Sequence, residues 1–304
     1  MAPAYLDPSS PLASRPLGRT GLSVSPLGLG TGRLGSADLS ESEAERLLHG
    51  ALDAGITLID TAPSYGLAEE RIGRHLARRR KDFTLSTKGG YGVPGVPDWT
   101  GTVITAGIDA ALARMRTSWL DIFHLHSCPQ ETLERGEVIE ALEAAVQAGK
   151  VRVAAYSGDG APLALAVGSG RFGSVQASVN FCDQRILDAE LPAAQAAGMG
   201  LIAKRALANA PWRFFSRPRG DYAEVYWERL QAMRIDPGAM AWDELALRFA
   251  AFQPGVSACL VGTASVKRLL HNARLLQKGP LPEAQVEAIR RAFRDNDQGW
   301  VGQV

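Results

Sequence analysis

The chain has 304 residues, and its 33 lysines and arginines nearly balance its 32 aspartates and glutamates, which leaves a formal net charge of +1. Because there is no basic excess to neutralise phosphates, the composition argues against a nucleic-acid partner, and no apolar run approaches the roughly 20 residues of a membrane helix. The three cysteines lie far apart without a CxxC pair, so we expect no disulfide framework and no metal site, and we predict a cytoplasmic protein.

The chain is expected to form one folded domain behind a short tail. Residues 1–14 are rich in proline, serine and alanine and lack the apolar stretch of a secretory signal, so we predict a flexible N-terminal tail there and a single domain over 15–304. The segment RPLGRTGLSVS (15–25) places Gly-Arg-Thr-Gly between two short extended pieces, which predicts a β-hairpin.

Beyond the hairpin, short apolar runs alternate with longer segments of helical periodicity. The predicted strands span residues 25–32, 57–62, 83–88, 121–126, 151–157, 174–180, 200–206 and 258–263. The predicted helices span residues 41–55, 68–80, 102–115, 134–150, 161–170, 187–198, 240–252 and 265–276. The residues after the last helix predict only a short tail.

These strand–helix units predict a parallel sheet, because one parallel strand can follow another only through a crossover. An open doubly wound sheet holds a similar number of strands, but no GxGxxG motif follows any strand, as it normally does in a dinucleotide-binding open sheet. We therefore predict an α/β fold, a (β/α)8 TIM barrel with an N-terminal β-hairpin. The longest connection, 207–239, is too aromatic for disorder and is expected to be functional.

In such a barrel the catalytic groups lie at the carboxyl ends of the strands. The second, third and fourth predicted strands end near Asp60, Lys88 and His126, and Tyr65 lies in the loop after Asp60. An ammonium beside a phenol favours the phenolate, so Lys88 can assist Tyr65 as a proton donor while Asp60 keeps Lys88 charged. His126 can hydrogen-bond the same substrate oxygen. The set predicts polarisation and protonation of a carbonyl, with hydride from a reduced cofactor.

Each of these residues also has a purely structural interpretation. Asp60 and Lys88 can be a buried ion pair, Tyr65 a packed loop aromatic and His126 a satisfied core histidine. His124 lies on the same strand face as His126, so either imidazole can line the barrel. The placement of all four groups at adjacent strand ends favours the catalytic interpretation.

Three segments carry a resemblance to a known family: DAGITLIDTAPSYGLAEERIG (53–73), STK (86–88), and DIFHLH (121–126) followed by SCP. In this order they resemble the aldo-keto reductase superfamily, whose pattern is Asp-Thr-Ala-x-x-Tyr-Gly, then a strand-ending lysine and a strand-ending histidine. The resemblance covers about residues 15–275 and fits a bacterial-type member with a short C-terminal tail.

By motif position, the resemblance implies that Asp60, Tyr65, Lys88 and His126 form the catalytic set. The family's Asp-x-x-x-x-His spacing, which here begins at Asp121, selects His126 rather than the neighbouring histidine. Members of the family are barrels that bind NADPH without a Rossmann fold. The resemblance therefore implies a nicotinamide cofactor, in agreement with the missing glycine motif.

At the nicotinamide end of that cofactor, the resemblance implies that Ser157 and Gln176 hold the carboxamide. Gly158 stands where the family usually has an asparagine, and an aspartate follows it. Many members stack an aromatic side chain on the nicotinamide ring from the end of the seventh strand. The matching stretch offers Lys204 or Arg205 instead.

At the adenosine end, VGTASVKRLLHN (261–272) resembles the family's phosphate-binding segment. Gly262 and Thr263 end the last strand, where Thr263 and the following helix N-terminus can receive a phosphate. Arg268 is implied to contact the 2′-phosphate and Asn272 the adenine. The resemblance thus implies NADP, with NADPH preferred, whereas NAD stays possible because a lysine that some members carry at Gly262 is absent.

The sequence therefore predicts an NAD(P)-dependent aldo-keto reductase (EC 1.1.1.-) acting on a small-molecule carbonyl or sugar. It would reduce an aldehyde or ketone, or oxidise the corresponding alcohol or aldose, with Tyr65 as the general acid. One alternative is an aldolase or lyase that forms a Schiff base on Lys88, which requires a neutral amine next to Asp60. The other is a pyridine-nucleotide-binding regulatory subunit with vestigial turnover.

Overall fold

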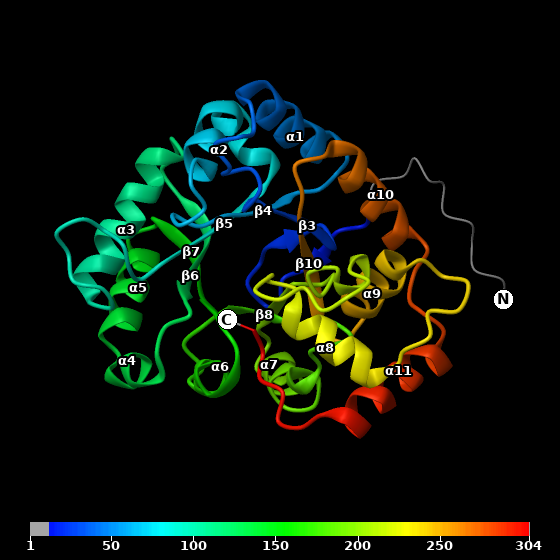
Figure 1. The fold of residues 1–304 in the computed structure, drawn as a ribbon. Helices are drawn as coiled ribbons and strands as arrows, with labels where there is room; N and C mark the ends of the chain where they lie inside the picture. Colours follow the sequence, from blue (N-terminus) through cyan, green and yellow to red (C-terminus); the bar gives the residue numbers. More distant parts are fainter. Residues whose placement is uncertain (1–11, 304) are drawn as a thin grey trace.

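The computed structural model describes residues 12–303, so most of the predicted tail over 1–14 lies outside the described residues. Eight parallel strands close into a barrel, in which each strand pairs with the next and the last pairs with the first (Figure 1). The barrel strands are β3 (Leu27–Gly30), β4 (Leu58–Asp60), β5 (Thr84–Gly89), β6 (Leu120–His126), β7 (Val151–Ser157), β8 (Ser174–Ser178), β9 (Gly200–Lys204) and β10 (Val256–Gly262). The predicted (β/α)8 barrel is confirmed.

The predicted N-terminal hairpin is also present and closes one end of the barrel. It consists of the antiparallel strands β1 (Arg15–Pro16) and β2 (Ser23–Val24). Its buried side chains pack with those of the barrel strands and are Leu17, Leu22 and Val24. The turn requires glycine at position 18, because φ there is +54° and a Cβ would lie 2.4 Å from the carbonyl oxygen of Gly198.

Helices cover the outside of the barrel (Figure 1). They are α1 (Glu41–Asp53), α2 (Ala68–Leu76), η1 (Ala77–Asp82), α3 (Gly101–Arg114), α4 (Gln130–Arg135), α5 (Glu137–Gln147), α6 (Gly160–Gly168), η2 (Arg185–Leu187), α7 (Glu190–Ala196), η3 (Pro211–Arg213), α8 (Glu224–Met233), α9 (Trp242–Ala251), α10 (Val266–Gln277) and α11 (Glu283–Asn296). Ser40 caps the N-terminus of helix α1 and forms a capping box with Glu43. None of the helices in the described part of the chain has the length and apolarity of a membrane-spanning segment.

Two helices, α8 and α11, lie where a loop and a short tail are predicted. Both contribute to a second core cluster, in which Tyr226 and Phe293 are buried together with Phe181. Tyr226 of 207–239 is thus packed in a core, whereas Phe215 of the same segment is fully exposed, and the prediction of a short tail after the last helix is wrong. Helix α11 follows Pro282, which provides no side-chain cap, but its buried residues Ile289 and Phe293 lie four apart on one face, a helical spacing that the prediction overlooked.

The single helix predicted over 134–150 is wrong at its start. Gly136 has a φ of +83°, in the left-handed region, and this residue both ends α4 and begins α5. Its amide donates to the carbonyl oxygen of Leu133, which closes the last turn of α4. The glycine therefore separates two short helices where the sequence indicates one.

Asp121, the second residue of β6, has a buried carboxylate, and both of its oxygens accept hydrogen bonds. One oxygen accepts from Arg80 at 2.7 Å and from the amide of Leu85 at 2.9 Å, and the other accepts from Arg152 at 2.9 Å. The guanidinium of Arg80 lies 4.4 Å from the ring centroid of Trp119. The carboxylate therefore compensates a buried cation and links three neighbouring strands and η1.

We expect Asp121→Asn to lower the free energy of unfolding by about 3 kcal/mol, because it leaves the buried guanidinium of Arg80 without a counter-charge. The matched control is Asp109→Asn. Asp109 pairs with Lys150 at the surface, where the two side chains are 51% and 40% exposed, so its loss should be under about 1 kcal/mol. Urea denaturation at pH 7 measures both values, and equal losses would contradict the prediction.

Candidate active site

The carboxyl ends of neighbouring strands bring two of the predicted catalytic residues into direct contact. Lys88, near the end of β5, places its Nζ atom 2.5 Å from Oδ2 of Asp60 at the end of β4. The same ammonium donates to the backbone carbonyl of Thr61 at 2.8 Å. Both side chains are almost completely buried, at 1% and 3% exposure. The predicted ion pair is therefore formed inside the mouth of the barrel.

Both members of this pair are held in their charged forms. Burial lowers the pKa of Lys88, but Asp60 and the nearby phenol of Tyr65 raise it by more, so the net pKa lies above the ordinary value. Burial raises the pKa of Asp60, but Lys88, His124 and the hydrogen bond from Ser86 outweigh it, and the net pKa is lowered. At neutral pH the site therefore contains an ammonium and a carboxylate.

A chain of hydrogen bonds joins this ion pair to two residues predicted to bind the cofactor. Oδ1 of Asp60 accepts from the hydroxyl of Ser86 at 2.7 Å and from Nε2 of Gln176 at 2.9 Å. The hydroxyl of Ser157 in turn donates to Oε1 of Gln176 at 3.1 Å. The Gln176 amide still has one N–H and one lone pair unused in these bonds, so a carboxamide can be bound there. The two predicted groups share one polar network.

Tyr65 is held close to Lys88 by a tightly packed loop between β4 and α2. The Nζ atom of Lys88 lies 5.2 Å from the centroid of the Tyr65 ring. A Cβ at Gly35 would lie 1.5 Å from the carbonyl oxygen of Tyr65, and the amide of Leu67 donates to the carbonyl oxygen of Gly35 at 3.1 Å. Only glycine at position 35 allows this approach, which places the phenol beside the ammonium.

The two histidines of β6 occupy different layers of the barrel. His124 is fully buried, and its Nε2 lies 3.0 Å from the hydroxyl of Ser86. His126 is only partly buried, and its Nδ1 lies 2.7 Å from the hydroxyl of Tyr91. Burial lowers the pKa of His124 to about 4 and that of His126 to about 3, and Lys88 adds to the effect on both. Both imidazoles are therefore neutral at pH 7, with His126 nearer the opening.

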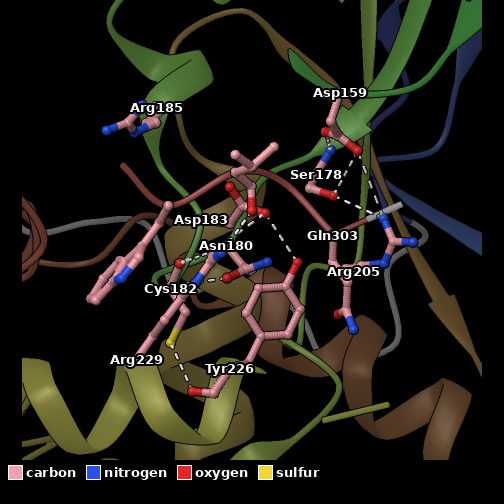
Figure 2. A network of polar contacts seen from close by, with 12 residues as sticks. Asp159, Ser178, Asn180, Cys182, Asp183, Arg185, Arg205, Tyr226, Arg229 and Gln303 are labelled. Atoms are coloured by element: carbon pink, nitrogen blue, oxygen red, sulfur yellow. Dashed lines mark hydrogen bonds and ion pairs between the residues drawn. The ribbon is translucent and has the colours of Figure 1, made fainter. Parts of the chain in front are cut away.

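Lys204 and Arg205, predicted to replace an aromatic ring, meet at a single carboxylate. Nζ of Lys204 lies 2.8 Å from Oδ2 of Asp159, and Arg205 lies 3.8 Å from the same oxygen. Asp159 also accepts from the amide of Ser178 at 2.8 Å (Figure 2). Arg205 donates to the hydroxyl of Tyr222 at 3.0 Å. Because two cations share one carboxylate, this wall of the mouth keeps an excess positive charge.

The segment after α11 returns to the mouth and covers this cluster (Figures 1 and 2). A Cβ at Gly302 would lie 2.7 Å from Cβ of Asp159, so the backbone packs directly on that residue. The side-chain amide of Gln303 accepts from Asn209 through its oxygen and donates to the backbone carbonyl oxygen of Tyr222 through its nitrogen, both at 3.0 Å. Gly302 and Gln303 therefore belong to the wall of the site.

The remaining predicted cofactor residues form a separate group at the end of β10. The hydroxyl of Thr263 accepts from the amide of Ser265, and Ser265 caps the N-terminus of α10. Gly262 leaves the approach to this helix end free of a side chain, since a Cβ there would touch only one backbone oxygen, at 3.7 Å. The Arg268 side chain is exposed and has no partner among residues 12–303, whereas Asn272 is buried. These features fit a phosphate-binding end of the site.

Two polar residues of the site were not predicted from the sequence. Ser86 lies two residues before Lys88 on β5, and the alternation of a strand could have placed both on one face. Tyr91 follows the strand in a loop, where no periodicity applies. No group of three or more histidine, cysteine or acidic side chains is positioned for a metal ion in the part of the chain that the structure describes.

The chain is similar in sequence and fold to proteins of a known family. The model of the aldo/keto reductase family matches residues 26–294. The chain is 28% identical over 278 residues to L-galactose dehydrogenase of Arabidopsis thaliana, a match that covers 85% of this chain and 86% of that protein. It is 36% identical over 158 residues to 6-dehydroglucose reductase of Novosphingobium aromaticivorans. That match covers 48% of this chain and 52% of the other protein, about half of each.

Among solved structures, the holo form of an aldo-keto reductase from Bacillus halodurans is similar to this chain. The TM-score is 0.80 at 26% sequence identity, and the similarity covers 92% of this chain and 96% of the other. The likeness therefore extends over the whole barrel.

We expect the free energy of unfolding to fall as the pH decreases from about 6.5 toward 4, in part because of His124. The unfolded chain binds a proton at this residue near its ordinary pKa, whereas the folded chain does not until about pH 4. Acid therefore favours the unfolded chain in this window. Urea denaturation at several pH values measures how steeply the free energy of unfolding changes with pH. This slope should be smaller for His124→Gln than for the wild type.

His271→Gln is the control for this pH dependence. The side chain of His271 is 54% exposed, whereas that of His124 is buried, so this variant controls for the loss of a histidine as such. Because the slopes are compared between variants, contributions from other titrating groups cancel. An unchanged slope in His124→Gln would show that the burial of His124 does not govern its protonation.

Proposed function

This chain belongs to the aldo/keto reductase family, and we propose that it is an NAD(P)H-dependent oxidoreductase that reduces aldehydes or ketones by hydride transfer. The reverse reaction would oxidise the corresponding alcohol or aldose. A small-molecule carbonyl or sugar is the proposed substrate, as the names of the two relatives suggest. The observation that carries the proposal is the hydrogen-bonded chain from Lys88 through Asp60 and Gln176 to Ser157.

The catalytic residues divide the work of protonating a carbonyl. Lys88 stays an ammonium, and its charge beside Tyr65 stabilises the phenolate that is left when the hydroxyl gives its proton to the substrate oxygen. Asp60 holds that ammonium in place. His126 is neutral and can donate a hydrogen bond to the same oxygen. A reduced nicotinamide cofactor supplies the hydride when it is bound.

We assign the nicotinamide end of the cofactor to the mouth of the barrel. Ser157 and Gln176 would hold the carboxamide with the N–H and lone pair that the Gln176 amide still has. Lys204 and Arg205 would border the ring, with Asp159 neutralising part of their charge.

We assign the adenosine end to β10 and α10. Gly262, Thr263 and the N-terminus of α10 would receive a phosphate. Arg268 would contact a 2′-phosphate and Asn272 the adenine. An exposed guanidinium without a partner among residues 12–303 favours NADP over NAD, since it can bind a phosphomonoester. A cytoplasmic location fits the three cysteines, which are free and buried.

The aldolase or lyase alternative requires a neutral amine at Lys88, and the raised pKa of that residue argues against it. The regulatory alternative predicts binding of the cofactor without appreciable turnover. A panel of aldehydes, ketones and sugars, monitored by NADPH and NADH absorbance with the purified protein alone, separates this alternative from an enzyme. The absence of turnover with every substrate and both cofactors would overturn the proposed function.

Tyr65→Phe should reduce the turnover number by at least tenfold while leaving the affinity for NADPH nearly unchanged. The substitution removes only the hydroxyl, whose proton is needed as charge develops on the substrate oxygen, so about two to four orders of magnitude are expected. Turnover is measured by NADPH absorbance and affinity by quenching of tryptophan fluorescence. Retention of more than about a tenth of the wild-type turnover would argue against Tyr65 as the general acid.

Arg268→Ala should weaken NADPH binding by about tenfold or more and leave NADH binding nearly unchanged. A hydrogen bond to a charged group contributes roughly 1.5–3 kcal/mol. NADH has no 2′-phosphate, so its binding does not depend on this bond. Lys267→Ala is the matched control, because it removes the neighbouring exposed cation on the same helix. If the wild type binds both cofactors equally, or Arg268→Ala weakens both, the assignment of the 2′-phosphate is wrong.

A further inference from the structure

Tyr91 and His126 form an isolated hydrogen-bonded pair at the mouth of the barrel. The phenol oxygen lies 2.7 Å from Nδ1 of His126, and the two rings are nearly parallel, at 28°, with centroids 5.6 Å apart. Among residues 12–303, neither side chain has another hydrogen-bond partner. The opposite ring nitrogen of His126, Nε2, has no protein partner within the same residues and is available to a ligand.

The direction of this hydrogen bond is linked to the tautomer of His126. His126 is neutral at pH 7, so one ring nitrogen carries a hydrogen and the other accepts. A phenol is a good donor, and Nδ1 is the only protein acceptor within reach of this hydroxyl in the described chain. If Tyr91 donates to Nδ1, the hydrogen of the imidazole must lie on Nε2.

We propose that Tyr91 is a positioning residue that fixes the tautomer and the ring orientation of His126, so that Nε2–H points to the substrate oxygen. The proposal rests on the proposed function, in which His126 donates to that oxygen. Without the phenol, the imidazole could place its hydrogen on Nδ1 and present a lone pair to the substrate, which would repel the oxygen instead of binding it.

Contacts within the loop that carries Tyr91 fix the position of its ring. Trp99 packs edge-on against Tyr91, with centroids 5.8 Å apart and planes at 61°. The amide of Trp99 donates to the carbonyl oxygen of Gly90 at 2.7 Å, and Asp98 accepts from the amide of Gly92 at 2.9 Å. These bonds tie the two ends of the loop together.

The same loop contains strained backbone, which supports a positioning role. Trp99 has a φ of +59°, which is costly for a residue with a Cβ. Gly90 has a φ of +129°, and a Cβ there would lie 2.1 Å from the Trp99 ring. The conformation of Trp99 persists only because the surroundings enforce it, whereas glycine adopts a positive φ readily. Here the result is a phenol held against the imidazole.

His124 provides an internal reference for the test. The hydroxyl of Ser86 donates its single hydrogen to Asp60, so it can only accept from Nε2–H of His124. The tautomer of His124 is therefore fixed by residues other than Tyr91. A change caused by Tyr91 should appear in the signals of His126 and not in those of His124.

The experiment compares the ring-nitrogen NMR signals of the wild type and Tyr91→Phe at pH 7, both prepared with ¹⁵N-labelled histidine. The variant His126→Gln identifies the His126 signals. We expect wild-type His126 to carry its hydrogen on Nε2. In Tyr91→Phe its two nitrogen shifts should move toward each other as the tautomers mix. Tyr222→Phe, which removes a phenol that contacts Arg205 and not His126, should leave the His126 signals in place. Unchanged His126 signals in Tyr91→Phe would overturn the proposal.

Turnover of the same variants provides the second readout. Tyr91→Phe should lower kcat about fivefold, the value expected for the loss of one hydrogen bond, without weakening NADPH binding. An unchanged kcat would overturn the positioning role. Because the NMR measurement needs no substrate, the two hypotheses fail separately. A wild type without turnover but with the expected shifts contradicts the proposed function, whereas normal turnover with unchanged shifts contradicts only the role of Tyr91.

Discussion

The rest of the site depends on the buried ion pair between Lys88 and Asp60. Moving an ammonium and a carboxylate out of water costs several kcal/mol per ion, and their attraction offsets this cost only when the remaining donors and acceptors are also bonded. Thr61, Ser86 and Gln176 provide those bonds. Because they come from β5, β8 and the loop after β4, the pair can be stable only in the closed barrel.

This requirement explains why the groups proposed for catalysis lie on one side of the mouth. The charges of the pair are fixed by strands that cannot move independently, so in the proposed reaction the field at Tyr65 would already be oriented before a substrate enters. His126, in contrast to the charged pair, is held in its neutral form, because burial beside Lys88 lowers the pKa of its imidazole. A charged donor would compete with the ammonium, whereas a neutral imidazole can donate a hydrogen bond without adding another cation to the same pocket.

The predictable part of the molecule follows from local rules. Strand periodicity and the position of strand ends are enough to place Asp60, Lys88 and His126 at one end of a barrel. Two departures from the family pattern, near Asp159 and at Lys204, look independent in the sequence, yet the structure joins them in one ion pair. This contact, and the return of the C-terminal segment to the mouth, depend on tertiary packing between segments far apart in the chain, which no local pattern contains.

The backbone of the mouth also carries strain that the barrel core must support. In the described chain, most residues other than glycine with a positive φ follow the carboxyl ends of β5, β6 and β9, namely Trp99, Ser127, Arg205, Ala208, Asn209 and Ala210. The other two, Arg116 and Arg234, lie just after helices, where left-handed residues commonly end a turn. At the amino-terminal end of the barrel, which the apolar hairpin closes, Arg116 in the loop between α3 and β6 is such a residue, so positive φ values are concentrated at the mouth and are not exclusive to it. The barrel therefore separates a stabilising end from a strained, polar end, and the ion pair and the aromatic loop lie at the strained one.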